Sequence, residues 1–230
     1  MANNNPKELS GRHAADMVQS GMTVGLGTGS TVFFTLQRLA ERIKEEGLEI
    51  RGVPTSVDTQ TKADEMGIPT VSLDDVQRLD ITIDGADEID ADFQMIKGGG
   101  GALLREKVVA SITERQIIIV GRNKVVQRLG LGFLLPVEYV PFAGSTVAAA
   151  LRRFGSEPAT RSTPDGEAFV TDNGNYIFDC RFPQGIADPR ALDLEIAHVP
   201  GVVECGLFID LAHVLVVGDE DGNVEVSEKS

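Results

Sequence analysis

Up to Gly121 the chain alternates short apolar segments with segments whose apolar residues have helical spacing. Such alternation is typical of a parallel sheet with helices on both faces, because parallel strands are joined by helical crossovers. Strands are expected at residues 22–26, 48–53, 79–83 and 116–120, and helices at 6–20, 32–46, 58–66 and 102–114. The sequence therefore predicts an α/β fold whose ligands bind where the strands end.

From about Leu131 the pattern changes. A proline-rich stretch leads into a helix expected at 145–154, and Asn173-Gly174 predicts a hairpin between segments 169–172 and 176–181. The remaining expected elements are a helix at 193–197, a strand at 202–208, a strand at 214–217 that returns to the first sheet, and a frayed tail at 225–230. These residues form a small α+β unit that is inserted into the first domain or follows it. With the insertion, we predict a Rossmann-like α/β parallel-sheet domain at 1–130 and 208–230 and a smaller inserted α+β domain at 131–207.

Composition excludes several classes of protein. The net charge of −14 would repel a nucleic acid backbone, and no lysine or arginine stripe offsets it. No apolar run reaches the roughly 20 residues that cross a bilayer, and the start MANNNPKELS lacks a secretory signal. Cys180 and Cys205 have no disulfide or metal-ligand spacing and are expected to be reduced thiols. We therefore expect a cytoplasmic protein that binds neither nucleic acid nor membrane.

The acidity leaves open the ionic strength at which the protein works. Arginine outnumbers lysine and carboxylates occur along the whole chain, which would suit a high-salt cytoplasm where screening makes a large net charge tolerable. An ordinary acidic cytosolic enzyme fits the same composition equally well. Full stability at low ionic strength would exclude the high-salt hypothesis.

The segment GLGTGST, residues 25–31, follows one predicted strand and precedes a helix. Glycines such as Gly29 let backbone N–H groups approach an anion, the helix N-terminus adds its dipole, and Thr28, Ser30 and Thr31 add hydroxyl donors. A phosphate cradle is the functional interpretation, and a simple tight turn is the alternative. The loop lacks the GK[ST] of a P-loop, and Ser30 replaces the third glycine of the dinucleotide fingerprint.

Carboxylates cluster in the segment DGADEID, residues 84–90, directly after the third predicted strand. This position places Asp84 at the ligand edge of the sheet, and Asp87 follows it beyond Gly85 and Ala86. Both carboxylates could accept hydrogen bonds from sugar hydroxyls or move a hydroxyl proton. A divalent metal site is a competing interpretation, but the spacing does not match a calcium loop. A solvated acidic loop is the other alternative.

Four consecutive glycines follow Lys97, and a helix that carries Glu106 comes next. Such a run is entropically costly, so close backbone approach of Gly98, Gly99 and Gly100 to a ligand is the natural reason for it. A surface glutamate paired with a neighbouring basic residue is the alternative for Glu106. Its neighbourhood, with a lysine, a glycine loop and two aspartates, favours a catalytic role.

These residue types together suit the movement of a carbonyl group between C1 and C2 of a sugar phosphate. A carboxylate whose pKa is raised by burial can take the carbon-bound proton and return it to the adjacent carbon. A lysine and backbone N–H groups can stabilise the enediolate, and a hydroxyl-rich glycine loop can hold the phosphate.

The segments GLGTGST, DGADEID and KGGGGALLREK, with LPVEYVPFA, VTDNGNYIFD and PGVVECGLF, resemble in order and spacing those of the type A ribose-5-phosphate isomerases. The resemblance covers almost the whole chain. It implies interconversion of ribose 5-phosphate and ribulose 5-phosphate in the non-oxidative branch of the pentose phosphate pathway. It also implies no metal, no organic cofactor, and a homodimeric or homotetrameric assembly.

By the same resemblance Glu106 matches the general base of the family, and Asp84, Asp87 and Lys97 match its sugar-ring and oxyanion residues. The substrate-binding residues that it implies are Thr28, Gly29, Ser30, Thr31, Asp84, Gly85, Ala86, Asp87, Lys97, Gly98, Gly99, Gly100 and Lys124. Gly101 and Leu104 depart from the alanine and threonine of the family's KGGGAALTREK, which affects only the local fit.

Two rival functions come from other classes. A nicotinamide-dependent dehydrogenase would need an acidic residue about 20 residues beyond the glycine loop. Glu45 and Glu46 fall near that distance but lie in the helix expected at 32–46. A sugar-phosphate sensing module would need a DNA-binding segment, which the sequence lacks, and would not explain Glu106 and Lys97 together. Nucleotide binding would identify the first rival, and ligand binding without turnover would identify the second.

Overall fold

The computed structural model describes residues 5–229, and the chain divides into two compact units. The larger unit comprises 1–86, 105–125 and 210–230, of which 1–4 and 230 lie outside the described residues. The smaller unit comprises 87–104 and 126–209. The domain boundaries predicted from the sequence, with 131–207 as the inserted domain, stay a prediction. The compact units differ from them mainly in placing 87–104 in the smaller unit.

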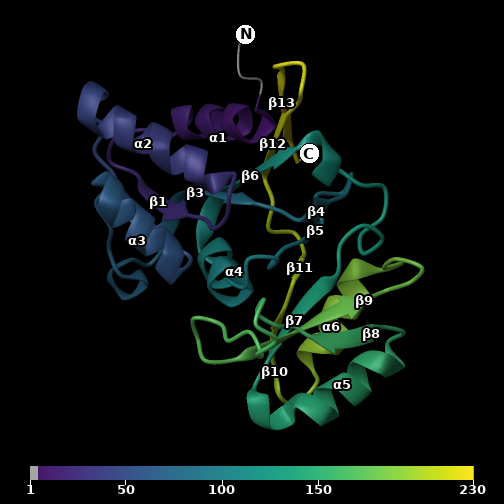
Figure 1. The fold of residues 1–230 in the computed structure, drawn as a ribbon. Helices are drawn as coiled ribbons and strands as arrows, with labels where there is room; N and C mark the ends of the chain where they lie inside the picture. Colours follow the sequence, from purple (N-terminus) through teal and green to yellow (C-terminus); the bar gives the residue numbers. More distant parts are fainter. Residues whose placement is uncertain (1–4, 230) are drawn as a thin grey trace. The chain divides into compact units, whose positions relative to one another are not determined.

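The larger unit is built on a six-stranded sheet (Figure 1). Its strands, in their order across the sheet, are β13 (Val224–Glu228), β12 (Val214–Gly218), β6 (Thr113–Gly121), β3 (Leu79–Gly85), β1 (Thr23–Leu26) and β2 (Arg51–Pro54). All neighbouring pairs from β12 to β2 are parallel, and β13 alone runs antiparallel to its neighbour. This sheet confirms the predicted α/β fold, and β12 confirms that the strand expected at 214–217 returns to it.

The helices of the larger unit begin and end at residues that suit those positions. Asn5 caps α1 by accepting a backbone N–H of the first turn at 3.2 Å, and Pro6 follows it. Ser56 caps α3 by accepting the Thr59 N–H at 3.0 Å, and Gly47 ends α2 with a φ of 69°. The helices are α1 (Pro6–Asp16), α2 (Val32–Glu46), α3 (Val57–Met66), α4 (Leu103–Ser111), which belongs to this unit from Arg105 onward, and the short η1 (Leu73–Asp75) and η2 (Arg122–Lys124).

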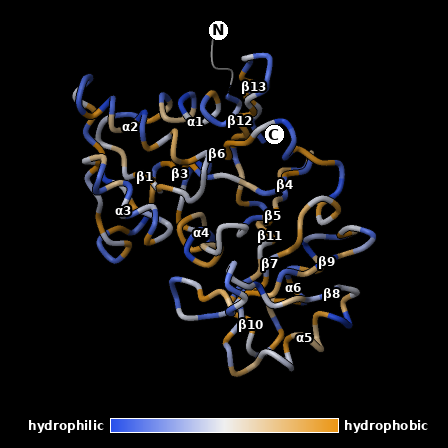
Figure 2. The backbone as a smooth tube through the Cα atoms, in the orientation of Figure 1, coloured by the Kyte–Doolittle hydropathy of each residue, from blue (hydrophilic) through white to orange (hydrophobic). Residues whose placement is uncertain are grey.

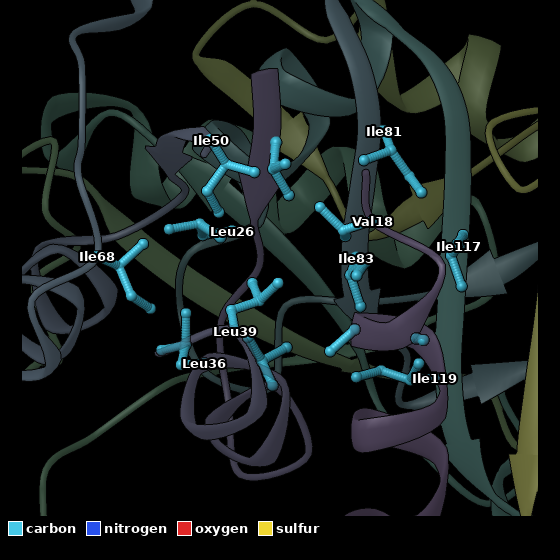
Figure 3. Packing of buried hydrophobic residues seen from close by; sticks show 14 of the residues in the cluster. Val18, Leu26, Leu36, Leu39, Ile50, Ile68, Ile81, Ile83, Ile117 and Ile119 are labelled. Atoms are coloured by element: carbon cyan, nitrogen blue, oxygen red, sulfur yellow. The ribbon is translucent and has the colours of Figure 1, made fainter. Parts of the chain in front are cut away.

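Helices cover both faces of this sheet. On one face, Leu36 and Leu39 of α2 pack in a buried cluster with Ile83 of β3 and Ile117 of β6 (Figure 3). On the other, Val109 of α4 packs in a separate cluster with residues of β2 and β3. Figure 2 shows the central strands as hydrophobic stretches, whereas much of α2 and α3 is hydrophilic. Burial of this apolar surface, at about 25 cal/mol per Å², is the main force that holds the helices on the sheet.

Hydrogen bonds from arginine side chains also join α1 and α2. Arg42 Nη1 donates to the carbonyls of Ala15, in the last turn of α1, at 2.6 Å and of Val18, just beyond that helix, at 2.9 Å. Arg12 of α1 forms a bidentate pair with Glu41, and this hydrogen-bonded guanidinium lowers the pKa of the Glu41 carboxyl. The two helices are therefore joined by directional contacts as well as by apolar packing.

His213 links the start of β12 to β6. Its ring Nδ1 accepts the backbone N–H of Gln116 at 3.0 Å, and the backbone N–H of His213 donates to the Gln116 carbonyl at 3.0 Å. Partial burial, followed by the charges of Lys229 and Arg115, lowers the pKa of His213 below its usual 6.5. The unfolded chain therefore binds a proton at the His213 imidazole more readily than the folded chain does. The stability that neutral His213 contributes is present above pH 6.5 and is lost as the pH falls through the lowered pKa.

We expect the unfolding free energy of the wild type to fall more steeply than that of His213→Asn between about pH 7.5 and about pH 5. The asparagine oxygen can still accept the Gln116 N–H, but the side chain does not titrate. Urea denaturation of both proteins at several pH values measures the difference. Parallel pH profiles would contradict the role given to His213.

The smaller unit contains two antiparallel sheets and two helices. One sheet has the strand order β10–β7–β9–β8, and the other has the order β11–β5–β4. Val147 of α5 and Ile196 of α6 pack in one buried cluster with Val137 of β7. The elements are β4 (Glu88–Ile89), β5 (Met95–Ile96), β7 (Leu135–Tyr139), η3 (Pro141–Ala143), α5 (Gly144–Arg153), β8 (Glu157–Thr160), β9 (Tyr176–Arg181), α6 (Pro189–Ala197), β10 (Val202–Cys205) and β11 (Leu207–Phe208). This is the α+β architecture predicted for the inserted part.

Several local predictions are wrong. Residues 169–172 form no strand: β9 pairs with β7 and β8, and Asn173-Gly174 lies in a turn closed by the Thr171 N–H and the Asn175 carbonyl at 2.9 Å. The expected tail forms β13 as far as Glu228, because pairing with β12 satisfies its backbone groups. The helices expected at 6–20 and 102–114 end earlier, at Asp16 and Ser111.

Gly206 divides the strand expected at 202–208 into β10 and β11, which belong to different sheets. Its N–H donates to the Pro136 carbonyl at 2.7 Å, and its carbonyl accepts the Lys97 N–H at 2.9 Å. A side chain here would place its Cβ 2.3 Å from the Lys97 carbonyl oxygen. Glycine therefore lets the chain pass from one sheet to the other within a single residue.

Among residues 5–229, no helix has both the length and the apolar character required to cross a membrane.

Candidate active site

The first glycine loop lies between the end of β1 at Leu26 and the start of α2 at Val32. The Thr28 N–H donates to Asp84 Oδ1 at 3.1 Å. A side chain at Gly27 would place its Cβ 2.2 Å from the same oxygen, so only glycine fits at this position. The backbone of the loop is therefore held against the end of β3, with Asp84 as its anchor.

Asp84 is fully buried at the carboxyl end of β3, so the alternative of a solvated acidic loop is wrong for this residue. Its Oδ1 accepts the Gly85 N–H at 2.7 Å in addition to the Thr28 N–H. A buried carboxylate is stable only when such donors surround it. Asp84 thus fixes the first glycine loop, whatever further contact it makes with a ligand.

Three hydroxyl groups that local sequence patterns did not single out surround the Thr28 side chain. Its Oγ1 lies 2.8 Å from Thr55 Oγ1, 2.9 Å from Ser56 Oγ and 3.2 Å from Thr59 Oγ1. Thr59 Oγ1 also donates to the Gly27 carbonyl at 2.8 Å. The available signal was the hydroxyl run directly after β2, where Ser56 caps α3. The cluster holds the first glycine loop from the side of β2.

Lys7 is a second residue that the sequence did not point to. Its Nζ donates to Ser30 Oγ at 2.9 Å, which places a positive charge beside the first glycine loop. The two residues line a shallow hollow of about 540 Å³ together with Asn5, Phe33, Phe34 and Lys62. Because 23 positions separate Lys7 from Ser30, no local motif could reveal this contact. The hollow offers a cation and a hydroxyl to an anionic ligand.

The carboxyl ends of β1, β3 and β6 lie along one edge of the sheet, because these strands are parallel neighbours. The first glycine loop, Asp84 and η2 with half-buried Lys124 follow these three ends in turn. Helix α4 leads into β6, so its first turn starts on the same edge. Glu106 lies in that turn and is only 5% exposed, so the alternative of an exposed surface glutamate is wrong.

Lys97 belongs to the smaller unit and directly follows β5. Its side chain is only 2% exposed, and its Nζ lies 5.3 Å from the centroid of the Phe208 ring. A cation over an aromatic face gains electrostatic energy when water is removed. The backbone of Lys97 is also fixed by its hydrogen bond to Gly206. The fold therefore places the buried ammonium group of Lys97 directly before the second glycine loop, residues 98–101.

Asp87 holds that second loop as Asp84 holds the first. Its Oδ2 accepts the Gly99 N–H at 2.8 Å. A side chain at Gly99 would place its Cβ 2.8 Å from the other carboxylate oxygen of Asp87. Gly99 and Gly100 are nevertheless exposed, so the loop backbone is fixed and still open to a ligand.

Each unit thus brings together part of the predicted site. The residues in the larger unit are Thr28, Gly29, Ser30, Thr31, Asp84, Gly85, Ala86, Glu106 and Lys124, and those in the smaller unit are Asp87, Lys97, Gly98, Gly99 and Gly100. The chain passes from one unit to the other at the Ala86–Asp87 and Leu104–Arg105 peptide bonds. Along the chain, Asp84 to Asp87 span the first of these bonds, and Glu106 follows the second by one residue.

One group of potential metal ligands occurs within the part of the chain that the structure describes. Asp193, Glu204 and Cys205 of the smaller unit place one ligand atom each within 4.8 Å of one another. The Cys205 thiol donates to Asp193 Oδ1 at 3.0 Å. The predicted catalytic residues do not belong to this group. Burial of the other thiol raises the pKa of Cys180 to about 12, which keeps it protonated and unreactive.

A sequence profile described as “Ribose 5-phosphate isomerase A (phosphoriboisomerase A)” matches residues 51–222. The chain belongs to the ribose 5-phosphate isomerase A family. The relative named “Ribose-5-phosphate isomerase A” from Bacillus mycoides is 47% identical over 218 residues, which cover 95% of this chain and 97% of that protein.

Two solved structures are similar to this ribose 5-phosphate isomerase A family member over nearly their whole length. Ribose 5-phosphate isomerase from Plasmodium falciparum has a TM-score of 0.94 at 39% identity and covers 97% of this chain and 98% of its own. A D-ribose-5-phosphate isomerase in complex with phospho-erythronic acid has a TM-score of 0.93 at 35% identity, with 97% and 99% covered. The resemblance found in the sequence motifs therefore extends to the fold.

Proposed function

We propose that this protein interconverts D-ribose 5-phosphate and D-ribulose 5-phosphate. The proposal rests above all on the 47% identity, across 95% of the chain, to a protein named ribose-5-phosphate isomerase A. The solved relative in complex with phospho-erythronic acid supports the same substrate class. That compound is a phosphorylated sugar acid, and its planar carboxylate resembles an enediolate.

Glu106 is the general base in the proposed reaction. Its carboxylate takes the proton from C2 of open-chain ribose 5-phosphate, a C1–C2 double bond forms, and negative charge develops on O1. The O2 hydroxyl proton passes to O1, the Glu106 carboxyl group returns its proton to C1, and C2 becomes the ketose carbonyl. The burial of Glu106 supports this role, because water is kept away from the carboxylate.

Lys97 and the second glycine loop stabilise the charge on O1 in this proposal. The buried Lys97 ammonium acts in surroundings where charges interact more strongly than they do in water. The N–H groups of Gly98 and Gly100 are additional donors, whereas the Gly99 N–H donates to Asp87 and fixes the loop. Asp84 and Asp87 bind sugar hydroxyls and help the proton to pass from O2 to O1.

The phosphate is held by the first glycine loop, at residues 28–31, and by Lys124. Hydroxyl and N–H donors ahead of α2 supply hydrogen bonds, and the N-terminus of that helix contributes its dipole. Lys7, which donates to Ser30, adds a positive charge at this place. Because the overall charge is −14, positive charge supplied locally by lysines is what makes the binding of a dianion favourable.

Lys7→Met is expected to raise KM for ribose 5-phosphate by about tenfold and to change kcat much less, because the phosphate does not react. Steady-state kinetics measure both constants. Lys62→Met is the matched control, since Lys62 lines the same hollow but is paired with Asp58 at 2.5 Å. An equal effect of the two variants, or no effect of Lys7→Met on KM, would contradict this role.

We further propose that the protein works in the cytoplasm as a homodimer or homotetramer, in the non-oxidative pentose phosphate pathway. No metal, organic cofactor, nucleic acid or membrane takes part. These proposals rest on the family and on the composition, in particular the absence of a basic stripe from the sequence. Light scattering of the purified protein measures the assembly.

The proposed reaction is tested by an NMR time course with ribose 5-phosphate in deuterated water that contains a chelator. Formation of ribulose 5-phosphate, with deuterium entering at C1, is the expected result and would establish metal-independent proton transfer. Ligand binding with no ketose and no exchange, at low and at high salt, would refute the proposal and favour the sensing module. Tight nicotinamide-nucleotide binding would favour the dehydrogenase instead.

A further inference from the structure

Arg161 follows β8 in the smaller unit, and its guanidinium is fixed by two neighbours. Nε and Nη2 donate to the two carboxylate oxygens of Asp179 at 3.0 Å and 2.5 Å. The Phe169 ring centroid lies 5.7 Å from Arg161 Cζ. The arginine and aspartate side chains are only 13% and 22% exposed. A bidentate pair with these features holds a guanidinium in one orientation.

The third nitrogen of this guanidinium contacts the second glycine loop. Arg161 Nη1 donates to the Gly98 carbonyl at 2.9 Å and to the Gly99 carbonyl at 3.2 Å. The Gly98–Gly99 peptide is thereby held at both ends, because its N–H donates to Asp87 at 2.8 Å. A flexible glycine segment is thus fixed by a cation on one side and by a carboxylate on the other.

The same contact sets the direction of the next donor. In a planar trans peptide the N–H points opposite to the carbonyl. Because the Gly99 carbonyl accepts from Arg161, the Gly100 N–H is directed away from the guanidinium. Gly101 completes the loop. Its N–H donates to the Gly98 carbonyl at 3.0 Å, and a Cβ on Gly101 would lie 2.6 Å from the Phe169 ring. Arg161 and Phe169 together fix the backbone on both sides of Gly100 and so determine where its exposed N–H points.

We infer that Arg161 is a positioning residue, which orients the Gly100 N–H of the second glycine loop toward the oxygen that becomes negative during isomerisation. The inference rests on the proposed function for its catalytic consequence, and on the hydrogen bonds alone for its structural part. Arg161 acts through the loop and does not itself touch the substrate. Its loss should therefore lower kcat more than it raises KM, since the oriented donors matter most in the transition state.

The test compares three variants with the wild type. Arg161→Ala removes the contact, and the double variant Arg161→Ala with Asp179→Asn removes it without leaving an unpaired carboxylate, which could otherwise prevent folding. Arg181→Met is the matched control, because Arg181 ends the neighbouring strand β9 and forms an exposed 3.8 Å pair with Glu157. For each variant, kcat, KM, the melting temperature and the NMR amide exchange of Gly99 and Gly100 are measured.

Both Arg161 variants are expected to lose at least about tenfold in kcat, equivalent to about 1.4 kcal/mol, with a smaller change in KM. Their Gly99 amide should exchange faster than in the wild type, because the peptide has lost one of its two partners. Guanidinium ion at a few millimolar should restore part of the kcat of the single variant Arg161→Ala, which leaves room for the ion and keeps its partner Asp179, whereas equal sodium chloride should not. Arg181→Met should match the wild type in every measurement.

Wild-type kcat together with wild-type amide exchange in the double variant would overturn the inference. A kcat loss that follows a lower melting temperature, without guanidinium rescue, would also overturn it, because Arg161 would then serve only general stability. If the wild type itself shows no turnover, the proposed function fails. The amide exchange of Gly99 then still decides whether Arg161 holds the loop.

Discussion

Glu106→Gln should lower kcat for ribose 5-phosphate by about 10²- to 10⁴-fold. Glutamine has nearly the same shape as glutamate, so it can occupy the buried position in the first turn of α4. Its amide cannot accept the carbon-bound proton, so both the abstraction from C2 and the return to C1 would fail. Substrate binding should change little, because the phosphate and hydroxyl contacts are separate from this carboxylate.

Two measurements make the Glu106 expectation decisive. Steady-state kinetics give kcat, and exchange of the C2 proton with deuterated water reports the abstraction step without the need for product. Glu114→Gln is the matched control, because Glu114 is an exposed glutamate paired with Arg78 at the start of β6. Activity of Glu106→Gln within about tenfold of the wild type, only about 1.4 kcal/mol of barrier, would exclude Glu106 as the base.

Lys97→Met should lower kcat by about 10²- to 10³-fold, in the range seen when one stabilising donor is removed from a developing oxyanion. Methionine fills a volume similar to the lysine stem and removes the charge. The fold should tolerate the change, since an apolar side chain costs less than a charge at a position that is 2% exposed. Lys97→Met should therefore reduce turnover strongly in kinetic assays and leave the melting temperature of the protein unchanged.

The two outcomes for Lys97 lead to different assignments. A collapsed melting temperature would mean that the ammonium over Phe208 serves the fold of the smaller unit. Lys44→Met on the exposed side of α2 controls for the loss of one positive charge from an acidic protein. If that variant lost as much activity as Lys97→Met, long-range charge would explain the result, and the local role of Lys97 would be abandoned.

The fold of the larger unit could be predicted from the sequence because its signals are local. Glycine loops after apolar strands and helical spacing between them indicate a parallel sheet. The expectation for 214–217 succeeded because VLVV reads as a fully buried strand. The hairpin prediction failed for a complementary reason. Asn173-Gly174 specifies a turn, but which strand pairs with β9 depends on β7 and β8, which lie earlier in the chain.

The candidate site was likewise predictable only where its residues lie in local sequence motifs. Lys97, the glycine loops and the carboxylates at 84–90 lie in motifs, so the sequence points to them. Lys7 and Arg161 do not, because their partners Ser30 and Gly98 are 23 and 63 positions away. The sequence also gives no sign that Asp84 and Asp87 anchor the two loops, since hydrogen bonds from loop N–H groups to carboxylates depend on the folded backbone.

The pairing of β6 with β12 has a consequence for the synthesis of this protein. His213 contacts Gln116 across 97 positions of the chain. At the usual 5–20 residues per second, a ribosome needs roughly 5–20 s to add that length. Throughout this interval the QIIIV edge of β6 has no partner on that side, and an apolar strand edge of this kind promotes aggregation. The nascent chain therefore exposes an aggregation-prone strand edge until β12 has been synthesised.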